Sequence, residues 1–145
     1  MRCASLDCPI PFNPDLEVYL GYTYTVAKQL YDNSHPYVSL SARNKFASVI
    51  TYEFTPRFRS GIEVAYTGKQ YLDNRNKTPG YVFVAAMMRY DIKKISLVLN
   101  CENLFDYRQT RKETIVLPPN TNPSFKQIWA PLDGRVINLS AKISW

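Results

Sequence analysis

Six segments of the chain alternate apolar and polar residues with a period of two. This period places successive side chains on opposite faces of a β-strand, so it predicts an all-β chain. Each segment has about 10 to 13 residues, more than the usual globular strand and close to the length of a tilted strand that crosses a bilayer. The predicted strands are 16–28, 45–54, 59–71, 81–92, 95–106 and 135–145.

The connections between these segments alternate between long and short. Residues 55–58 and Lys93-Lys94 are short connections, whereas the first, third and fifth connections are long and polar. Outer-membrane barrels have short turns on one side and long extracellular loops on the other. The pattern therefore predicts antiparallel strands in up-and-down order, as in a transmembrane β-barrel.

Charge is confined to one of the two predicted faces. Even positions of the first four strands and odd positions of the last two form a face with no charge except Arg135 at the start of the last strand. A Lys or Arg on the lipid face near the bilayer midplane costs about 2 to 4 kcal/mol, which would enforce this separation. The opposite face carries Glu17, Lys45, Glu53, Arg59, Glu63, Lys69, Arg89, Asp91, Glu102 and Lys142.

A soluble β-sandwich also alternates, and aromatic placement separates the two alternatives. Membrane barrels collect aromatic rings where headgroups meet hydrocarbon, while a soluble core more often has its largest rings in mid-strand. The sequence predicts two such girdles on the uncharged face. Tyr52, Phe54, Tyr90 and Trp145 lie beside the short turns or the chain end, and Tyr22, Tyr24 and Tyr66 lie toward the long loops.

Residues 1–15 are rich in proline and are predicted to be an irregular leader, followed by one barrel unit over residues 16–145. The leader has no apolar h-region, so it does not predict a secretory signal. A soluble protein and a fragment with an upstream export signal would both explain this. Cys3, Cys8 and Cys101 are an odd number without nearby ligands to complete a zinc site, so neither a disulfide framework nor a metal or other cofactor is expected.

The chain has 18 Lys and Arg against 12 Asp and Glu, a net charge of +6. The basic residues are scattered rather than arranged in a stripe, so nucleic-acid binding is not predicted. His35, the only histidine, lies in a polar loop without an evident partner, and Glu63 and Glu102 are interpreted as lumen charges rather than an acid/base pair. The chain is not expected to be an enzyme.

Several motifs resemble those of TonB-dependent outer-membrane receptors. Asn103, Leu104, Phe105 and Asp106, within residues 98–106, resemble the family's "V-x-N-L-F-D" element at the end of the penultimate strand. Residues 62–73 resemble its "Y-x-G-x-x-Y" strand, and residues 79–82 resemble the start of the next strand. Residues 131–135 resemble its "P-x-G-R" last strand, although Asp133 precedes Gly134 and the chain ends in Trp rather than Phe. The resemblance covers residues 16–145.

The resemblance implies a receptor of the Gram-negative outer membrane that imports a scarce ligand: siderophore-bound iron, haem, cobalamin or a glycan. Such a receptor has about 22 strands around an N-terminal plug. The implied partners are outer-membrane lipid, missing upstream strands, a missing plug through which TonB acts, and the assembly machinery. The sequences of residues 107–111 and 129–134 are similar to those of receptors from the Bacteroidetes. The predicted assembly signal is Ile137, Leu139, Ala141, Ile143 and Trp145.

About six strands cannot enclose a receptor's lumen, so the chain alone is predicted to be an open sheet that does not transport. The alternative is a self-contained small β-barrel that serves as a binding or interaction module, although such barrels usually have eight strands. Ligand contact is expected from the long loops, where guanidinium groups and aromatic faces suit anionic, ring-bearing ligands. The candidate residues are Tyr71, Arg75, Tyr107, Arg108, Arg111 and Trp129.

Overall fold

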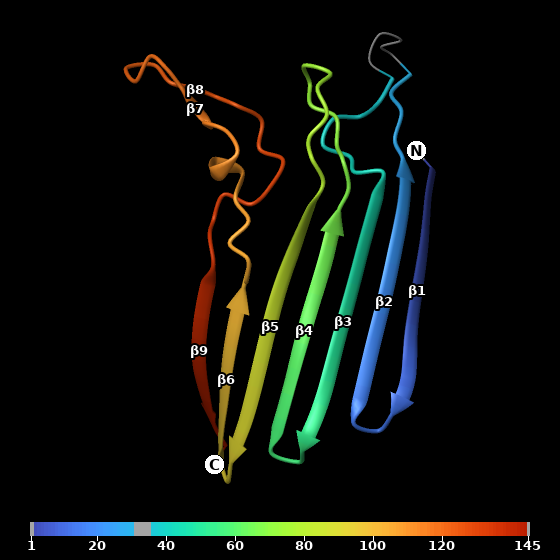
Figure 1. The fold of residues 1–145 in the computed structure, drawn as a ribbon, viewed down its shortest axis with the longest axis vertical. Coiled ribbons are helices and arrows are strands. Elements are labelled where there is room, and N and C mark those ends of the chain that lie inside the picture. Colours follow the sequence, from blue (N-terminus) through green and yellow to red (C-terminus); the bar gives the residue numbers. More distant parts are fainter. Residues whose placement is uncertain (1, 31–35, 145) are drawn as a thin grey trace.

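The computed structural model describes residues 2–30 and 36–144, which form one antiparallel sheet of seven strands. Each strand pairs with its neighbour in the sequence, so the order is up-and-down (Figure 1). The all-β, open-sheet architecture expected from the sequence is confirmed. The strands are β1 (Arg2–Asn13), β2 (Leu16–Val26), β3 (Asn44–Thr55), β4 (Phe58–Thr67), β5 (Tyr81–Ile92), β6 (Ile95–Glu102) and β9 (Val136–Ile143).

The first strand, β1, corrects two expectations. Residues 1–15 were predicted to be an irregular leader and the strand from Leu16 to be a sheet edge, but β1 pairs with β2 from Arg2 opposite Val26 to Asn13 opposite Leu16. The sheet therefore has seven strands rather than six, and β1 is its edge. The prolines concealed this strand, because proline within a strand pattern ordinarily argues against a strand.

The register explains why β1 tolerates Pro9 and Pro11. The Glu53 amide donates to the Asp15 carbonyl, so odd residues of the β2 segment bond to β3 and even residues bond to β1. The partners of those even residues on β1 are also even, such as Ile10 opposite Val18. The backbone of the two prolines thus faces the open edge, where a missing N–H removes no ladder hydrogen bond.

The last connection differs most from the expected pattern. Strand β6 ends at Glu102 rather than Asp106, because Asn103 has a φ of 49° and leaves the extended conformation. Residues 103–135 then contain a 3₁₀ helix, η1 (Gln109–Arg111), and a small ribbon of β7 (Val116–Leu117) and β8 (Ser124–Phe125). Within the part of the chain that the structure describes, no helix has the length and hydropathy to cross a membrane.

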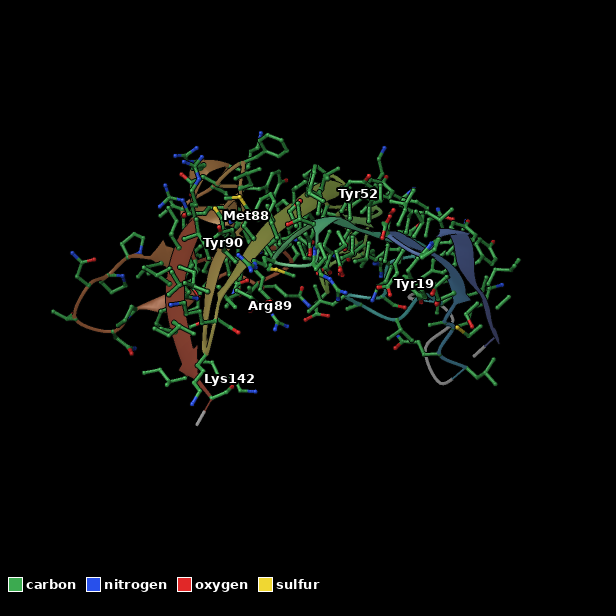
Figure 2. All side chains as sticks on the ribbon, turned by 90° about the horizontal axis from the view of Figure 1, so that it is seen from below. Tyr19, Tyr52, Met88, Arg89, Tyr90 and Lys142 are labelled. Atoms are coloured by element: carbon green, nitrogen blue, oxygen red, sulfur yellow. The ribbon has the colours of Figure 1, made fainter. Side chains whose placement is uncertain are left out.

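The two faces of the sheet match the parity expected from the sequence. Ile50 lies opposite Ile62, and Ile62 opposite Ala86, so the uncharged residues continue across the strands. The face then passes to odd positions, with Met88 opposite Leu99 and Leu99 opposite Leu139. The sheet is curved, with Tyr52, Met88 and Tyr90 on its convex side and Tyr19, Arg89 and Lys142 on its concave side (Figure 2).

The convex face exposes large apolar side chains, which a membrane barrel presents to lipid. Ile62 is 52% exposed and Leu139 is 73% exposed. Beside the short turns, the rings of Tyr52, Phe54, Phe58 and Tyr90 contact in sequence at centroid distances of 4.7, 5.2 and 6.3 Å. One predicted girdle is thus a continuous aromatic cluster; Trp145, also assigned to it, lies outside the described residues.

All three short turns lie at one end of the sheet, and the long connections lie at the other (Figure 1). The long connections are residues 27–43, 68–80 and 103–135. Most residues that are buried within the described ranges belong to this loop end, among them Ala42, Gln70, Gln109 and Trp129. The loop end is therefore the part of the molecule in which most side chains are buried, and the sheet itself is a single curved layer.

Candidate functional site

On the concave face, the pairing and the sign of the charged side chains change from the short-turn end of the strands to the loop end. Beside the short turns they are paired: Arg59 lies 2.6 Å from Glu53, and Arg89 lies 3.1 Å from Asp91. Farther along, Glu63 and Glu102 have no ion-pair partner among the described residues. At the loop end of β3 and β4, Arg43, Lys45 and Lys69 are positive.

Glu63 and Glu102 do not meet as a pair. Glu63 lies opposite Ala85 across the β4–β5 ladder, and Ala86 lies opposite Cys101 across the β5–β6 ladder, which places Glu102 on the same row as Glu63, two strands away. Two strand spacings are roughly 10 Å, too far for a shared proton. Between them the concave face has a hollow of about 430 Å³, lined partly by small residues such as Gly61 and Ala85.

A cluster of cations and tyrosine rings occupies the loop end of β2, β3 and β4. Tyr37 and Tyr71 stack at a centroid distance of 4.8 Å with an interplanar angle of 6°. Lys28 and Arg43 lie over the Tyr37 ring at 6.0 and 5.6 Å, and Lys77 lies over the Tyr71 ring at 5.2 Å. The stack therefore gathers three cations, each held by an aromatic face.

A hollow of about 350 Å³ opens beside this stack. Three cations, Arg43, Lys69 and Lys77, line it together with Tyr71 and Gln70. Arg43 and Lys69 lie just outside β3 and β4, and the hollow is also lined by Asn44 and Tyr66, which have the parity of the convex face. We call Lys28, Tyr37, Arg43, Lys69, Tyr71 and Lys77 the cationic cluster.

Near the other long loop, the predicted ligand residues make contacts within the chain. Tyr107 stacks on Tyr81 at 5.3 Å, and burial, followed by the neighbouring Tyr81, raises the pKa of Tyr107. Arg108 and Arg111 both pair with Asp106. Trp129 is buried, with its indole Nε1 donating to Glu113. These side chains support the loop, and their role as ligand contacts stays a prediction.

The remaining two predicted ligand residues lie on the side of the cationic cluster. Tyr71 belongs to the cluster, whereas Arg75 is an exposed residue of the 68–80 loop with a φ of 69°. The six candidates thus lie on two loops, which are joined by hydrogen bonds from Gln70 Nε2 to the Trp129 carbonyl at 3.1 Å and from the Asp73 amide to Gln127 at 2.9 Å. His35, which the sequence placed in the first long loop, lies outside the described residues.

The N-L-F-D and P-x-G-R elements are physically joined. The Asn103 side chain accepts from the Tyr107 amide at 2.8 Å and donates to the carbonyls of Tyr107 and Asp133 at 2.9 and 3.1 Å. The Arg135 guanidinium donates to the Leu104 carbonyl at 2.9 Å. We call these contacts the clasp, since they tie the end of β6 to the start of β9.

Asp106 is the charged centre of the clasp. It accepts from the guanidinium groups of Arg108 and Arg111 and from the Arg135 amide. Desolvation raises the pKa of the Asp106 carboxyl, but the two guanidinium charges outweigh it, so the pKa lies below its ordinary value. The departure at Asp133 leaves the clasp intact, because only the backbone of Asp133 takes part.

Glu113 and Gln109 organise the last loop. The Glu113 carboxylate accepts from Trp129 Nε1 at 2.7 Å, from Gln109 Nε2 at 2.9 Å and from Lys126 Nζ at 3.0 Å. These donors, the Trp129 indole first, lower the pKa of Glu113. Gln109 is fully buried and accepts from the Trp129 amide at 2.9 Å.

Sequence reasoning missed most of these residues for one reason. These residues belong to two loops: Lys28, Tyr37 and Arg43 lie in residues 27–43, and Lys77 lies in residues 68–80. Only the pairing of Lys28 with Tyr37 and of Tyr71 with Lys77 brings them together. A loop has no period from which such pairing could be read. In the described ranges, no three His, Cys, Asp or Glu side chains are grouped to hold a metal ion.

Comparison with known proteins shows the fold but not a family. No protein-family model and no curated protein sequence matches the chain. The siderophore receptor PiuA from Acinetobacter baumannii matches with a TM-score of 0.70 at 21% identity, over 96% of this chain and 21% of that chain. FpvA of Pseudomonas aeruginosa, bound to a pyoverdine and iron, matches at 0.66 and 22% identity, over 96% and 19%.

A third structure gives the same result. A mutant of the ferric enterobactin receptor PfeA from P. aeruginosa matches with a TM-score of 0.62 at 20% identity, over 72% of this chain and 16% of that chain. The chain spans about a fifth or less of the length of these three receptors. The likeness shows that its strands are arranged like a run of strands in a receptor barrel.

Proposed function

We propose that this chain is a barrel segment of a TonB-dependent outer-membrane receptor that takes up a scarce ligand such as siderophore-bound iron, haem, cobalamin or a glycan. One observation carries the proposal: an apolar convex face of membrane-spanning length backs a charged concave face that leads to long loops. The motif resemblance and the fold of the receptors PiuA and FpvA support it. No catalytic activity is proposed.

The same observation disfavours the small self-contained module. A soluble β-barrel that binds a lipophile points its apolar residues inward. Here the apolar face is convex, and the concave face carries Glu63, Arg89 and Lys142. Lipid, rather than an interior ligand, is the partner that this apolar face fits.

Neighbouring residues on opposite faces provide the test. In a background with Cys3, Cys8 and Cys101 changed to Ser, Ile62→Cys and Glu63→Cys would each carry an environment-sensitive fluorophore in liposomes. We expect the label at position 62 to be quenched by nitroxide lipids and the label at position 63 by aqueous iodide. Equal quenching of the two labels by either agent would contradict a sheet that has lipid on its convex face and water on its concave face.

The terminal strand is proposed to carry an assembly signal as well. Ile137, Leu139, Ala141 and Ile143 share the convex face of β9, and Ile137 and Leu139 are 65% and 73% exposed. Trp145, the last residue of this signal, lies outside the described residues. In a chimera of PiuA that has this chain as its matched segment, deletion of Trp145 should lower outer-membrane yield. Plain lipid anchoring would leave the yield normal.

The proposed origin of the chain from the Bacteroidetes rests only on the sequence similarity of residues 107–111 and 129–134 to receptors of that group. The receptors matched in structure come from Pseudomonas and Acinetobacter. We keep this origin as part of the proposal, to be tested by the genomic sequence around the gene, which would also show whether plug-coding sequence precedes the chain.

A further inference from the structure

We propose that the three long connections form one rigid body, which we call the loop cap and which opens only when residues 127–130, the strap, are released. The three connections lie at the same end of the sheet (Figure 1). A hairpin of residues 70–78 lies between the other two loops and is bonded to both. The biological meaning rests on the proposed function: in a receptor, the outer loops would be a preformed platform that moves as a unit.

The hairpin 70–78 has a closed and buried base. The Thr78 amide donates to the Gln70 carbonyl at 2.9 Å, and the Gln70 amide donates to the Thr78 hydroxyl at 3.0 Å. Tyr71 pairs with Lys77 inside this closure. Gln70 and Thr78 are 6% and 3% exposed. The base therefore fixes the hairpin between the ends of β4 and β5.

The strap is bonded to this hairpin at two points. Gln70 Nε2 donates to the Trp129 carbonyl at 3.1 Å, and the Asp73 amide donates to Gln127 Oε1 at 2.9 Å. These bonds join residues that are 59 and 54 positions apart in the sequence. Because Gln127 and Trp129 lie two residues apart, the strap cannot leave the hairpin without breaking both bonds.

Gln109 holds the strap from within its own loop. It is fully buried, and its Oε1 accepts from the amides of Trp129 and Ala130 at 2.9 and 3.3 Å. Its Nε2 donates to the Gln127 carbonyl at 3.0 Å and to the Glu113 carboxylate at 2.9 Å. An amide side chain has two donor hydrogens and two acceptor lone pairs, so all four are in use. Moving the strap alone would leave buried polar groups unpaired, which is costly.

The first long loop joins the same hairpin from its other side. The Leu40 amide donates to the Tyr71 carbonyl at 2.9 Å, and the rings of Tyr37 and Tyr71 stack at 4.8 Å. Long surface loops ordinarily move independently of one another. Here the hairpin links loop 27–43 to loop 103–135, so a displacement of one loop carries the others with it. A surface organised in this way before a ligand arrives loses less entropy on binding.

Distances between spin labels test whether the loops move together. In the cysteine-free background described above, Asn76→Cys and Thr114→Cys would each carry a nitroxide, since both native residues are exposed. Double electron–electron resonance on the whole chain, refolded in detergent micelles, should give a single narrow distance. Val38→Cys with Thr114→Cys, which spans the first and last loops, should also give a narrow distance. A broad distribution for either pair would overturn the loop cap.

The strap is tested by removing its two bonds to the hairpin. Gln70→Ala/Gln127→Ala should replace the narrow distance between positions 76 and 114 with a broad distribution. The control, Asn100→Ala/Asn138→Ala, removes two side-chain amides that lie opposite each other on β6 and β9 and should keep the distance narrow. Equal broadening in the two double variants would show a general loosening and refute the strap. A distance that stays narrow without Gln70 and Gln127 would refute it as well.

Two variants of equal charge separate hydrogen bonding from packing. Gln70→Glu keeps the size of the side chain but cannot donate to the Trp129 carbonyl, whereas Gln127→Glu keeps an oxygen that accepts from the Asp73 amide. At alkaline pH, where both introduced carboxylates are ionised, we expect Gln70→Glu to broaden the distance between positions 76 and 114 and Gln127→Glu to leave it narrow. Equal effects of the two substitutions would contradict the assigned hydrogen bonds.

The outcomes separate this inference from the receptor proposal. If the labels at positions 62 and 63 report lipid and water as expected while the loop distances are broad, the loop cap is wrong and the receptor proposal stands. If those labels contradict lipid on the convex face while the loop distances are narrow and depend on Gln70, the loop cap stands without the receptor.

Discussion

Asn103 is held in the left-handed region with a φ of 49°, where asparagine is favoured over most residues other than glycine. It is almost fully buried, at 3% exposure, and its side chain makes three hydrogen bonds. These facts give a physical reason for asparagine in the N-L-F-D element: one amide group satisfies the backbone of two distant segments.

We therefore predict that Asn103→Ala lowers the free energy of unfolding by about 2 to 4 kcal/mol, since the Tyr107 amide and the Asp133 carbonyl lose their partner. Asn138→Ala, an exposed position on β9, is the control and should change stability little. Urea unfolding of the micelle-refolded chain measures both. Similar values for the two variants would show that the clasp does not stabilise the fold.

Gly134 leaves no room for a side chain. A Cβ at this position would lie 2.6 Å from the Asp106 Oδ1 atom, closer than a stable contact allows. Gly134→Ala should cost about 1 to 3 kcal/mol by displacing the Asp106 carboxylate from the Arg135 amide. Asp133→Ala, where the native side chain is exposed, is the neighbouring control; a normal melting temperature for Gly134→Ala would refute the account.

At the scale of elements, the loop 103–135 contains two carboxylates with lowered pKa values, Asp106 and Glu113, and Glu113 is the one that contacts Trp129. The donors around Glu113 lower its pKa below the ordinary 4.5, so the folded loop is stabilised by the charged form above that pH. This stabilisation should be lost as the pH falls below 4.5 and through the lowered pKa of the folded state. The reason is that protonation weakens the bonds from Trp129 and Lys126.

Trp129 fluorescence in a Trp145→Phe background reports this transition. We expect a red shift of the emission as Trp129 becomes exposed at acid pH, and a smaller acid-dependent shift in Glu113→Gln, in which Asp106 still titrates. The control is Glu102→Gln, which removes a carboxylate outside this loop and should leave the transition unchanged. A red shift that begins above pH 6 would point to another group.

The strands could be predicted from sequence to the extent that they alternate. Strand β5 has the bounds that the pattern indicated, because each face of it meets a single environment. Strand β1 was missed, since Pro9 and Pro11 are acceptable only on an edge, and an edge is a property of the whole sheet. The end of β6 was missed because the φ of Asn103 is set by contacts with residues 107 and 133.

The candidate site was less predictable than the fold. Tyr71 was identified from its aromatic type, but Tyr37 and Arg43 become its neighbours only through loop pairing. Trp129 and Arg111 have the composition of ligand contacts, and the structure gives them partners in Glu113 and Asp106. Residue type alone does not distinguish a side chain that binds a ligand from one that holds a loop.

At the scale of the whole molecule, the curved sheet has an apolar convex face and a charged concave face. Ile62→Lys places a charge on the convex face and should destabilise the chain in liposomes by about 2 to 4 kcal/mol, whereas Glu63→Lys on the concave face should have a small effect. Folding yield and urea midpoint in liposomes measure the difference. Equal effects of the two substitutions would mean that lipid does not cover the convex face.

The two open edges of the sheet run in the same direction. Seven strands alternate in direction, so β1 and β9 both run from the loop end to the short-turn end (Figure 1). Joining them directly, or joining copies of the chain head to tail, would create a parallel seam in an otherwise antiparallel sheet. Antiparallel closure would therefore require an odd number of additional strands. Two copies of this chain would fail this condition at each seam, so an antiparallel barrel that includes this sheet would need a different piece with an odd number of strands.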